Sequence, residues 1–218
     1  MALITRSIVF VHGLLGNRES TWIYKDKGTE RKSIFWPKDL LPQRIQGARI
    51  FTYGYDADIV SSEYLTQRTL YLHANHLLTE LSEQRHDKQL PIIFVAHSLG
   101  GILVKNALIF SCESSERSET PDTSKRFQEI SLSTCGIVFI GTPHNSSDKQ
   151  SWPEIVSRIV QFSGARWDIV EALKRDSLVL QTNLDRFKSI SQNFRIHSFF
   201  ETKSTDSMGI VRFTSFLL

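Results

Sequence analysis

The chain has 218 residues, of which 40% are hydrophobic and 22% are charged, so it can bury a sizeable core and is not a disordered chain. Its formal net charge of +3 is small and spread along the sequence, which gives no support to nucleic-acid binding. No apolar run approaches the ~18 residues that a membrane-spanning helix needs, so no transmembrane segment is predicted.

We expect residues 1–218 to form one domain. The N-terminal stretch MALITRSIVFVHG lacks the basic region and the small-residue cleavage site of a signal peptide, so it predicts a first strand. An intracellular, reducing compartment follows as the default. There Cys112 and Cys135 are expected to be reduced thiols in or near the core.

Short runs rich in isoleucine, valine and phenylalanine alternate with longer amphipathic stretches. Strands are predicted at residues 7–12, 49–53, 92–97, 136–141 and 195–200, with a short last one near 209–213. Helices are predicted at residues 36–45, with a break at Pro42, and at 64–81, 101–111, 154–162 and 176–190. Because the strands are apolar throughout, they indicate a mostly parallel sheet with helices on both faces. Ligands then bind at the carboxyl ends of the strands.

Two stretches of the sequence, one polar and one rich in aromatic residues, are less simple to assign. Residues 113–134 are polar and charged, and we expect a solvated excursion with a short helix at its end. Residues 145–175 carry tryptophan, isoleucine and phenylalanine at roughly helical spacing. This segment is either part of the core or a cap over a pocket, and a cap with an aromatic lining would suit acyl chains.

The stretch PIIFVAHSLGGILVKNALIF turns sharply from a buried strand into a helix at Ser98. Small residues at −2 and +2, Ala96 and Gly100, are what a tight strand–helix reversal needs, and the serine is then held in a strained conformation above the sheet edge. The Leu99 N–H becomes a candidate donor to an oxyanion. A helix N-cap serine is the alternative interpretation of this motif alone.

Two further segments bring glycine-rich turns to the same edge. In IVFVHGLLG, residues 8–16, a strand ends in a turn that can offer the Leu14 N–H as a second oxyanion donor, with His12 orienting the turn through hydrogen bonds. In GIVFIGTPH, a strand runs into a Gly-Thr-Pro turn that ends at His144.

These segments resemble the α/β-hydrolase superfamily. More narrowly, they resemble the serine esterases related to the serine-active-site-containing protein and the hydrolase-like N-terminal domains of fungal immune-type receptors. The matched segments are IVFVHGLLGNRESTW, ARIFTYGYDAD, IIFVAHSLGGILVKNAL, GIVFIGTPHNSS and IHSFFET. The resemblance implies an α/β-hydrolase fold and a Ser98 nucleophile with oxyanion donors at Leu14 and Leu99. The pocket and motif residues that it implies are His12, Gly13, His97, Gly100 and His144. Ala96 departs from the family, which usually has glycine there.

The rest of the catalytic triad is incomplete in this sequence. The superfamily's order is nucleophile, acid, histidine, and Glu201 is the predicted acid, with Asp206 as second choice. No histidine follows Glu201, so the family's usual last strand, histidine loop and final helix are expected to be missing or replaced, as in a C-terminally incomplete product, a fragment or a non-catalytic relative. His97 is expected to face away from Ser98, and His144 could stand in as the base. The remaining candidates are expected on the surface: His73, His76 and His86.

Two functions remain open at this point. The first is a serine hydrolase acting on an apolar ester or lipid, with weak or absent turnover because a serine hydroxyl without a base is a poor nucleophile. The second is a hydrolase-like signalling or interaction module of a larger protein. The resemblance also implies peripheral attachment at the mitochondrion or endoplasmic reticulum and a role in lipid metabolism. Because no phosphate loop and no clustered His/Cys set is present, no cofactor and no metal ion are expected.

Overall fold

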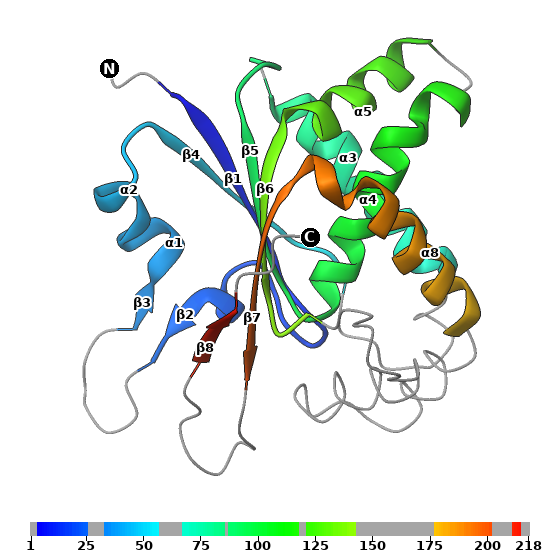
Figure 1. Ribbon diagram of the computed structural model, residues 1–218. Helices are drawn as coiled ribbons and strands as arrows, with labels where there is room; N and C mark the ends of the chain where they lie inside the picture. Colours follow the sequence, from blue (N-terminus) through cyan, green and yellow to red (C-terminus); the bar gives the residue numbers. More distant parts are fainter. Residues whose placement is uncertain are drawn as a thin grey trace.

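A six-stranded sheet in the order β4-β1-β5-β6-β7-β8 forms the centre of the computed structural model (Figure 1). The structure describes residues 4–25, 33–56, 67–85, 87–117, 121–142, 177–201 and 211–214. Neighbouring strands pair in parallel, except that β8 runs antiparallel to β7. The strands are β1 (Arg6–Val11), β4 (Ala48–Tyr53), β5 (Ile92–His97), β6 (Thr134–Ile140), β7 (Arg195–Glu201) and β8 (Val211–Thr214). All six predicted strands are confirmed within two residues at each end.

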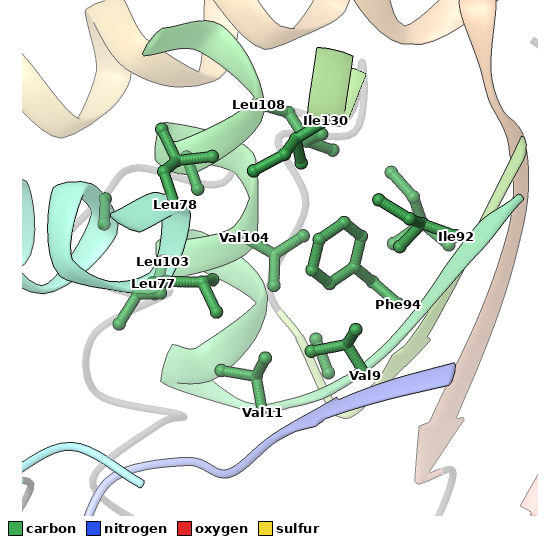
Figure 2. Close-up of a cluster of buried hydrophobic side chains, with 14 of the residues drawn as sticks. Val9, Val11, Leu77, Leu78, Ile92, Phe94, Leu103, Val104, Leu108 and Ile130 are labelled. Atoms are coloured by element: carbon green, nitrogen blue, oxygen red, sulfur yellow. The ribbon is translucent and has the colours of Figure 1, made fainter. Parts of the chain in front are cut away.

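Helices on one face of the sheet bury the larger core cluster. These helices are α3 (Gln67–Gln84), α4 (Leu99–Arg117), α5 (Pro121–Ser133) and α8 (Ser177–Ile190). Figure 2 shows strand residues such as Val9 and Phe94 pointing toward Leu77 and Leu103 on α3 and α4. Phe94 is fully buried, so its replacement by alanine is expected to cost about 3–5 kcal/mol of stability.

The opposite face is covered by short elements near the N-terminus. They are the 3-10 helix η1 (Ser20–Trp22), the antiparallel strands β2 (Ile23–Tyr24) and β3 (Ile34–Phe35), and the helices α1 (Trp36–Asp39) and α2 (Leu41–Arg44). Phe10 of β1 meets Trp22 and Trp36 edge to face, with ring centroids 5.0 and 5.1 Å apart. Because β1 buries apolar side chains on both faces, its continuous apolar run is explained.

The predicted helix at residues 36–45 is two helices that meet at Leu40. Pro42 lies in the first turn of α2, where its missing N–H removes no helical hydrogen bond. The break at Pro42 is therefore confirmed. The elements η1, β2 and β3 were not predicted, because two or three residues are too few to show a periodic pattern.

The short helix expected at the end of residues 113–134 is present and is longer than expected, but the solvated excursion expected before it is wrong. Instead, α4 continues to Arg117, and α5 packs along it as a second helix. Ile130 of α5 is 1% exposed, so it anchors the helix in the core. The Ser111 hydroxyl donates to the Phe127 carbonyl and accepts from the Ser131 N–H across the helix pair. A sequence that is polar in composition therefore forms a buried helix contact through its serine hydroxyls.

Of the remaining predictions, some are confirmed, some are corrected, and some concern residues that the structure does not describe. The helices predicted at 64–81, 101–111 and 176–190 are confirmed as α3, α4 and α8, of which α4 is longer than predicted at both ends. Cys112 is partly exposed, and Cys135 is exposed rather than in the core. The predicted helix at 154–162 and the cap at 145–175 lie outside the described residues. In the described ranges, no helix is both long and apolar enough to cross a membrane.

Candidate active site

Ser98 occupies the junction between β5 and α4 and has a left-handed backbone conformation, with φ of 50°. This conformation costs a non-glycine residue roughly 1–2 kcal/mol, so neighbouring contacts must maintain it. The Ser98 N–H donates to the carbonyl of Ile140 at 2.9 Å, and the Ser98 carbonyl accepts from the Gly101 N–H at 3.1 Å. Its hydroxyl makes no hydrogen bond to any residue that the structure describes. The geometry leaves this oxygen available for chemistry.

The first turn of α4 lies directly on the backbone of β1. A Cβ added at Gly100 would be 2.2 Å from the His12 carbonyl oxygen and 2.6 Å from that of Val11. Because these are backbone atoms, no side chain can be accommodated at Gly100. A Cβ at Gly101 would be 2.2 Å from the Thr142 Oγ1, which places the Gly-Thr turn after β6 against the same helical turn. Sequence reasoning identified Gly100 but missed the contact between Gly101 and Thr142.

Residues 12–16, predicted to carry an oxyanion donor and called the oxyanion loop below, also lie against Ser98. A Cβ added at Gly13 would be 2.8 Å from the Ser98 Cβ, so this loop passes close to the proposed nucleophile. The Gly16 N–H donates to the Gly13 carbonyl at 3.2 Å, and Leu15 has φ of 54° at the third position of this turn. Glycine or asparagine usually occupies that position. The turn is thus a second strained feature beside Ser98.

The two predicted oxyanion donors come from these two segments. Leu14 is 5% exposed, and its N–H donates to no acceptor in the described ranges. Leu99 is the first residue of α4, so its N–H has no partner inside the helix and lies at the positive end of the helix dipole. A pair of backbone N–H groups beside a nucleophile stabilises an oxyanion in acyl transfer, and this is the role predicted for Leu14 and Leu99.

His12 is fully buried, and both nitrogens of its ring are engaged. Its Nδ1 lies 3.0 Å from the Gly13 carbonyl oxygen, and its Nε2 accepts from the Tyr55 N–H at 3.3 Å. The rings of His12 and Tyr55 are stacked, with centroids 4.3 Å apart. This arrangement makes His12 part of the scaffold of the loop.

The other described histidines lie around the site without a hydrogen bond to the Ser98 hydroxyl. His97 packs toward Trp22 on the sheet face opposite α4, with ring centroids 6.5 Å apart. Burial, and secondarily the nearby His12, lower the pKa of His97, which favours its neutral form. His76 is exposed and lies 3.6 Å from Glu80.

His73 differs from the surface position expected for it. It is half-buried, and its ring centroid lies 5.2 Å from that of Tyr55. Desolvation lowers the pKa of His73, while the charge of Asp56 opposes that shift. His197 is exposed on β7, opposite Val138.

The structure brings Ser98, Leu99 and Gly100 together with the oxyanion loop, and His97 borders them. Glu201 ends β7, at the same edge of the sheet, but its side chain is not among the described groups. His86, His144 and Asp206 lie outside the described residues. Tyr55 and Thr142 are site neighbours that sequence reasoning did not single out. The GYD sequence directly after a predicted strand was the available signal for Tyr55.

Within the described ranges, no group of three or more histidine, cysteine, aspartate or glutamate residues is arranged to hold a metal ion. Thr142 is 1% exposed, and its Oγ1 has no hydrogen-bond partner in the described part of the chain.

Comparisons with known proteins indicate a family and a fold for this chain. A family model described as "Putative serine esterase (DUF676)" matches residues 5–151. Protein SERAC1 of Bos taurus is 30% identical over 217 residues, and Protein SERAC1 of Homo sapiens is 27% identical over the same length. Each alignment covers 93% of this chain but only 31% of the relative, so the chain spans less than a third of these curated proteins.

A solved structure supports the fold. The lipase BlEst2 of Bacillus licheniformis in its mature form superimposes with a TM-score of 0.51 at 17% sequence identity, covering 89% of this chain and 65% of the lipase. Together with the mostly parallel sheet and its helices, this similarity confirms the predicted α/β-hydrolase fold.

Proposed function

Because the chain belongs to the DUF676 serine esterase family, we propose that it is a serine hydrolase that cleaves carboxylic esters by acylation of Ser98. The observation that carries the proposal is the left-handed conformation of Ser98 at the end of β5, maintained by α4 packing on the backbone of β1 through Gly100. Strain of this kind is found where a nucleophile must project above a sheet edge.

The proposed reaction uses three groups from two separate segments. The Ser98 Oγ attacks the ester carbonyl carbon, and the oxyanion that forms accepts hydrogen bonds from the N–H groups of Leu14 and Leu99. The alcohol then leaves, and water hydrolyses the acyl-enzyme. Removing one such donor usually costs about 10²–10³ in rate. The oxyanion hole is therefore expected to supply much of the catalysis.

The general base sets the expected rate. Glu201 is the proposed acid of the triad, but no histidine follows it in the sequence. Without a complete triad, the oxyanion hole and binding alone give roughly 10³–10⁴ over water in well-studied enzymes. We therefore expect weak hydrolysis by the 218 residues. Grafting a strand, histidine loop and helix from an active family member after Leu218 should raise it.

An apolar ester or lipid is the proposed substrate. The support is the Leu15 side chain, which is 43% exposed next to the proposed donor Leu14. Rates on nitrophenyl esters should then increase with acyl chain length up to a limit. Peripheral contact with mitochondrial or endoplasmic-reticulum membranes, and further domains in a longer protein, are supported by resemblance to relatives of which this chain spans 31%.

A fluorophosphonate probe tests the nucleophile. The wild-type chain should be labelled, Ser98→Ala should not, and Ser191→Ala, a change at a buried serine on the 3-10 helix η2 (Ser191–Asn193), should be labelled like wild type. A nitrophenyl ester assay on the same three proteins measures turnover. Equal labelling of Ser98→Ala and wild type would refute Ser98 as the nucleophile.

A second candidate function is a non-catalytic interaction module that keeps the hydrolase fold. The observation that favours it is that none of the described histidines hydrogen-bonds the Ser98 hydroxyl, and that both ring nitrogens of His12 are engaged, one by the Gly13 carbonyl and the other by the Tyr55 N–H. Absence of labelling in a folded wild-type chain would decide for this function. Labelling that depends on Ser98 would decide against it.

A further inference from the structure

Tyr55 lies two residues beyond β4 and contacts the first residue of the oxyanion loop in three ways. Its backbone N–H donates to the Nε2 of His12 at 3.3 Å, and its hydroxyl donates to the His12 carbonyl at 3.0 Å. Its ring stacks on the His12 ring, with an interplanar angle of 10°. A residue 43 positions away in the sequence thus holds both the side chain and the backbone of His12.

These contacts determine which nitrogen of His12 carries the proton. Since the Tyr55 N–H is a donor, the Nε2 of His12 must be the acceptor and cannot itself be protonated. The proton of the neutral ring then lies on Nδ1, which donates to the Gly13 carbonyl at 3.0 Å. Tyr55 thereby selects the Nδ1–H tautomer of His12.

The Gly13 carbonyl orientation fixes the direction of the proposed oxyanion donor. This oxygen accepts from the His12 Nδ1–H and from the Gly16 N–H. The Gly13 carbonyl and the Leu14 N–H belong to one planar trans peptide unit, so they point in opposite directions. Holding the carbonyl on the His12 side therefore turns the Leu14 N–H away from it, and this N–H has no acceptor in the described ranges.

We propose that Tyr55 is a positioning residue of the oxyanion hole: its backbone N–H selects the Nδ1–H tautomer of His12, its hydroxyl holds the His12 carbonyl, and together these bonds orient the Leu14 N–H. The inference rests on the proposed function for its catalytic consequence, whereas the orientation itself can be observed without any activity. Tyr55 touches neither Ser98 nor the reacting atoms in this account. It acts through His12 and Gly13.

Tyr53 provides a matched control. It lies on the same strand end, stacks on Tyr55 with centroids 6.0 Å apart, and donates its hydroxyl to the His73 carbonyl of α3 at 3.1 Å. Desolvation raises the pKa of both phenols, so both remain protonated donors at neutral pH. Tyr53→Phe and Tyr55→Phe each remove one hydroxyl, but only the second removes a bond to the oxyanion loop, the one to the His12 carbonyl. The Tyr55 backbone N–H, and with it the tautomer of His12, is kept in Tyr55→Phe.

The kinetics of fluorophosphonate labelling measure the consequence at Ser98. In that reaction the Ser98 Oγ–phosphorus bond forms, the phosphorus–fluorine bond breaks, fluoride leaves and the hydroxyl proton passes to solvent or base. Tyr55→Phe should lower the rate at saturating probe by roughly 3- to 30-fold, with the half-saturating concentration within about twofold of wild type. Tyr53→Phe should change neither quantity by more than about twofold, although it lowers thermal stability. Equal saturating rates for Tyr55→Phe and Tyr53→Phe would overturn the proposal.

Nitrogen-15 NMR of the imidazole and leucine amides tests the orientation directly. The wild-type His12 should have a protonated Nδ1 and a bare Nε2, and Tyr55→Phe should shift the Leu14 amide resonance and speed its hydrogen exchange, while Tyr53→Phe leaves it in place. An Nε2–H tautomer in wild type, or a Leu14 amide unaffected by Tyr55→Phe, would refute the proposal. If wild type is not labelled by the probe, the proposed function fails, and these spectra alone decide the role of Tyr55.

Discussion

Lys105 offers the sharpest test of how this fold tolerates charge. It lies on α4 and is 3% exposed, with its Nζ 5.2 Å from the ring centroid of Phe139 and 5.7 Å from that of Phe187. Desolvation lowers the pKa of Lys105 from 10.5 to about 7. Contact with the two aromatic faces stabilises the charged form by about 1–2 kcal/mol. The desolvation penalty on the charged form is larger. Replacing Lys105 by methionine should therefore change how stability depends on pH.

The sign and size follow from proton linkage. Below pH 7 both states are protonated and the full penalty of the buried ammonium is present. Between pH 7 and 10.5 the unfolded state binds more protons, so the free energy of unfolding of the wild type rises with pH. Each pKa unit corresponds to about 1.4 kcal/mol, and the increase from pH 7 to pH 9 is roughly 2 kcal/mol. In Lys105→Met this increase is expected to disappear, and the variant should be more stable than wild type at pH 7.

Urea unfolding of wild type, Lys105→Met and Lys188→Met at pH 7, 8 and 9 measures the effect. Lys188 is exposed on α8, so its variant should follow the wild-type pH dependence. Because other lysines and tyrosines titrate similarly in all three proteins, the difference between the curves isolates Lys105. A wild-type curve parallel to that of Lys105→Met would show that the ammonium stays charged in the folded state, and the argument would be wrong.

Two further predictions test packing near the site and in the helix pair. Gly101→Ala should lose about 2 kcal/mol of stability, because the new Cβ would be 2.2 Å from the Thr142 Oγ1. This loss is opposite in sign to the gain of about 1 kcal/mol that alanine usually gives over glycine inside a helix. Adding Thr142→Ala should recover about half of that loss in urea unfolding; a Gly101→Ala chain more stable than wild type would contradict the contact. Ser111→Ala should cost about 1–3 kcal/mol by removing the hydroxyl bonds to the Phe127 carbonyl and from the Ser131 N–H. The exposed Ser189→Ala should cost little, and equal melting temperatures for the two variants would contradict a stabilising role of the Ser111 hydroxyl.

The sequence predicts an element of this fold when apolar burial stabilises it, and predicts it poorly when polar side-chain contacts do. The central strands β1 and β5 were found because both of their faces are buried, so their runs are apolar at almost every position. Only a short helix was predicted where α5 lies, because the contact of α5 with α4 depends on serine hydroxyls, which in sequence are typical of loops. Local composition thus predicts an element well only when apolar burial holds it in place.

In the candidate site, too, some features are predictable from local sequence and others are not. The small residue required at Gly100 is a local consequence of a tight reversal, so sequence alone predicts it. The contact of Thr142 with Gly101 joins two segments 41 positions apart (142 minus 101), and that of Tyr55 with His12 joins two segments 43 apart. No periodic or local rule points to such pairs. They exist only once β1, β4, β5 and β6 have been set side by side in the sheet.

The distribution of backbone strain bears on the choice between an enzyme and a non-catalytic module. In the described ranges, the non-glycine residues with positive φ are Leu15 and Ser98, and both lie at the proposed oxyanion hole. Each costs roughly 1–2 kcal/mol, and a glycine at either position would relieve the strain. A module that only binds a partner gains nothing from this strain. A hydrolase needs it, because the turn presents the Leu14 N–H and the reversal exposes the Ser98 hydroxyl, and this placement of strain favours the proposed acyl transfer.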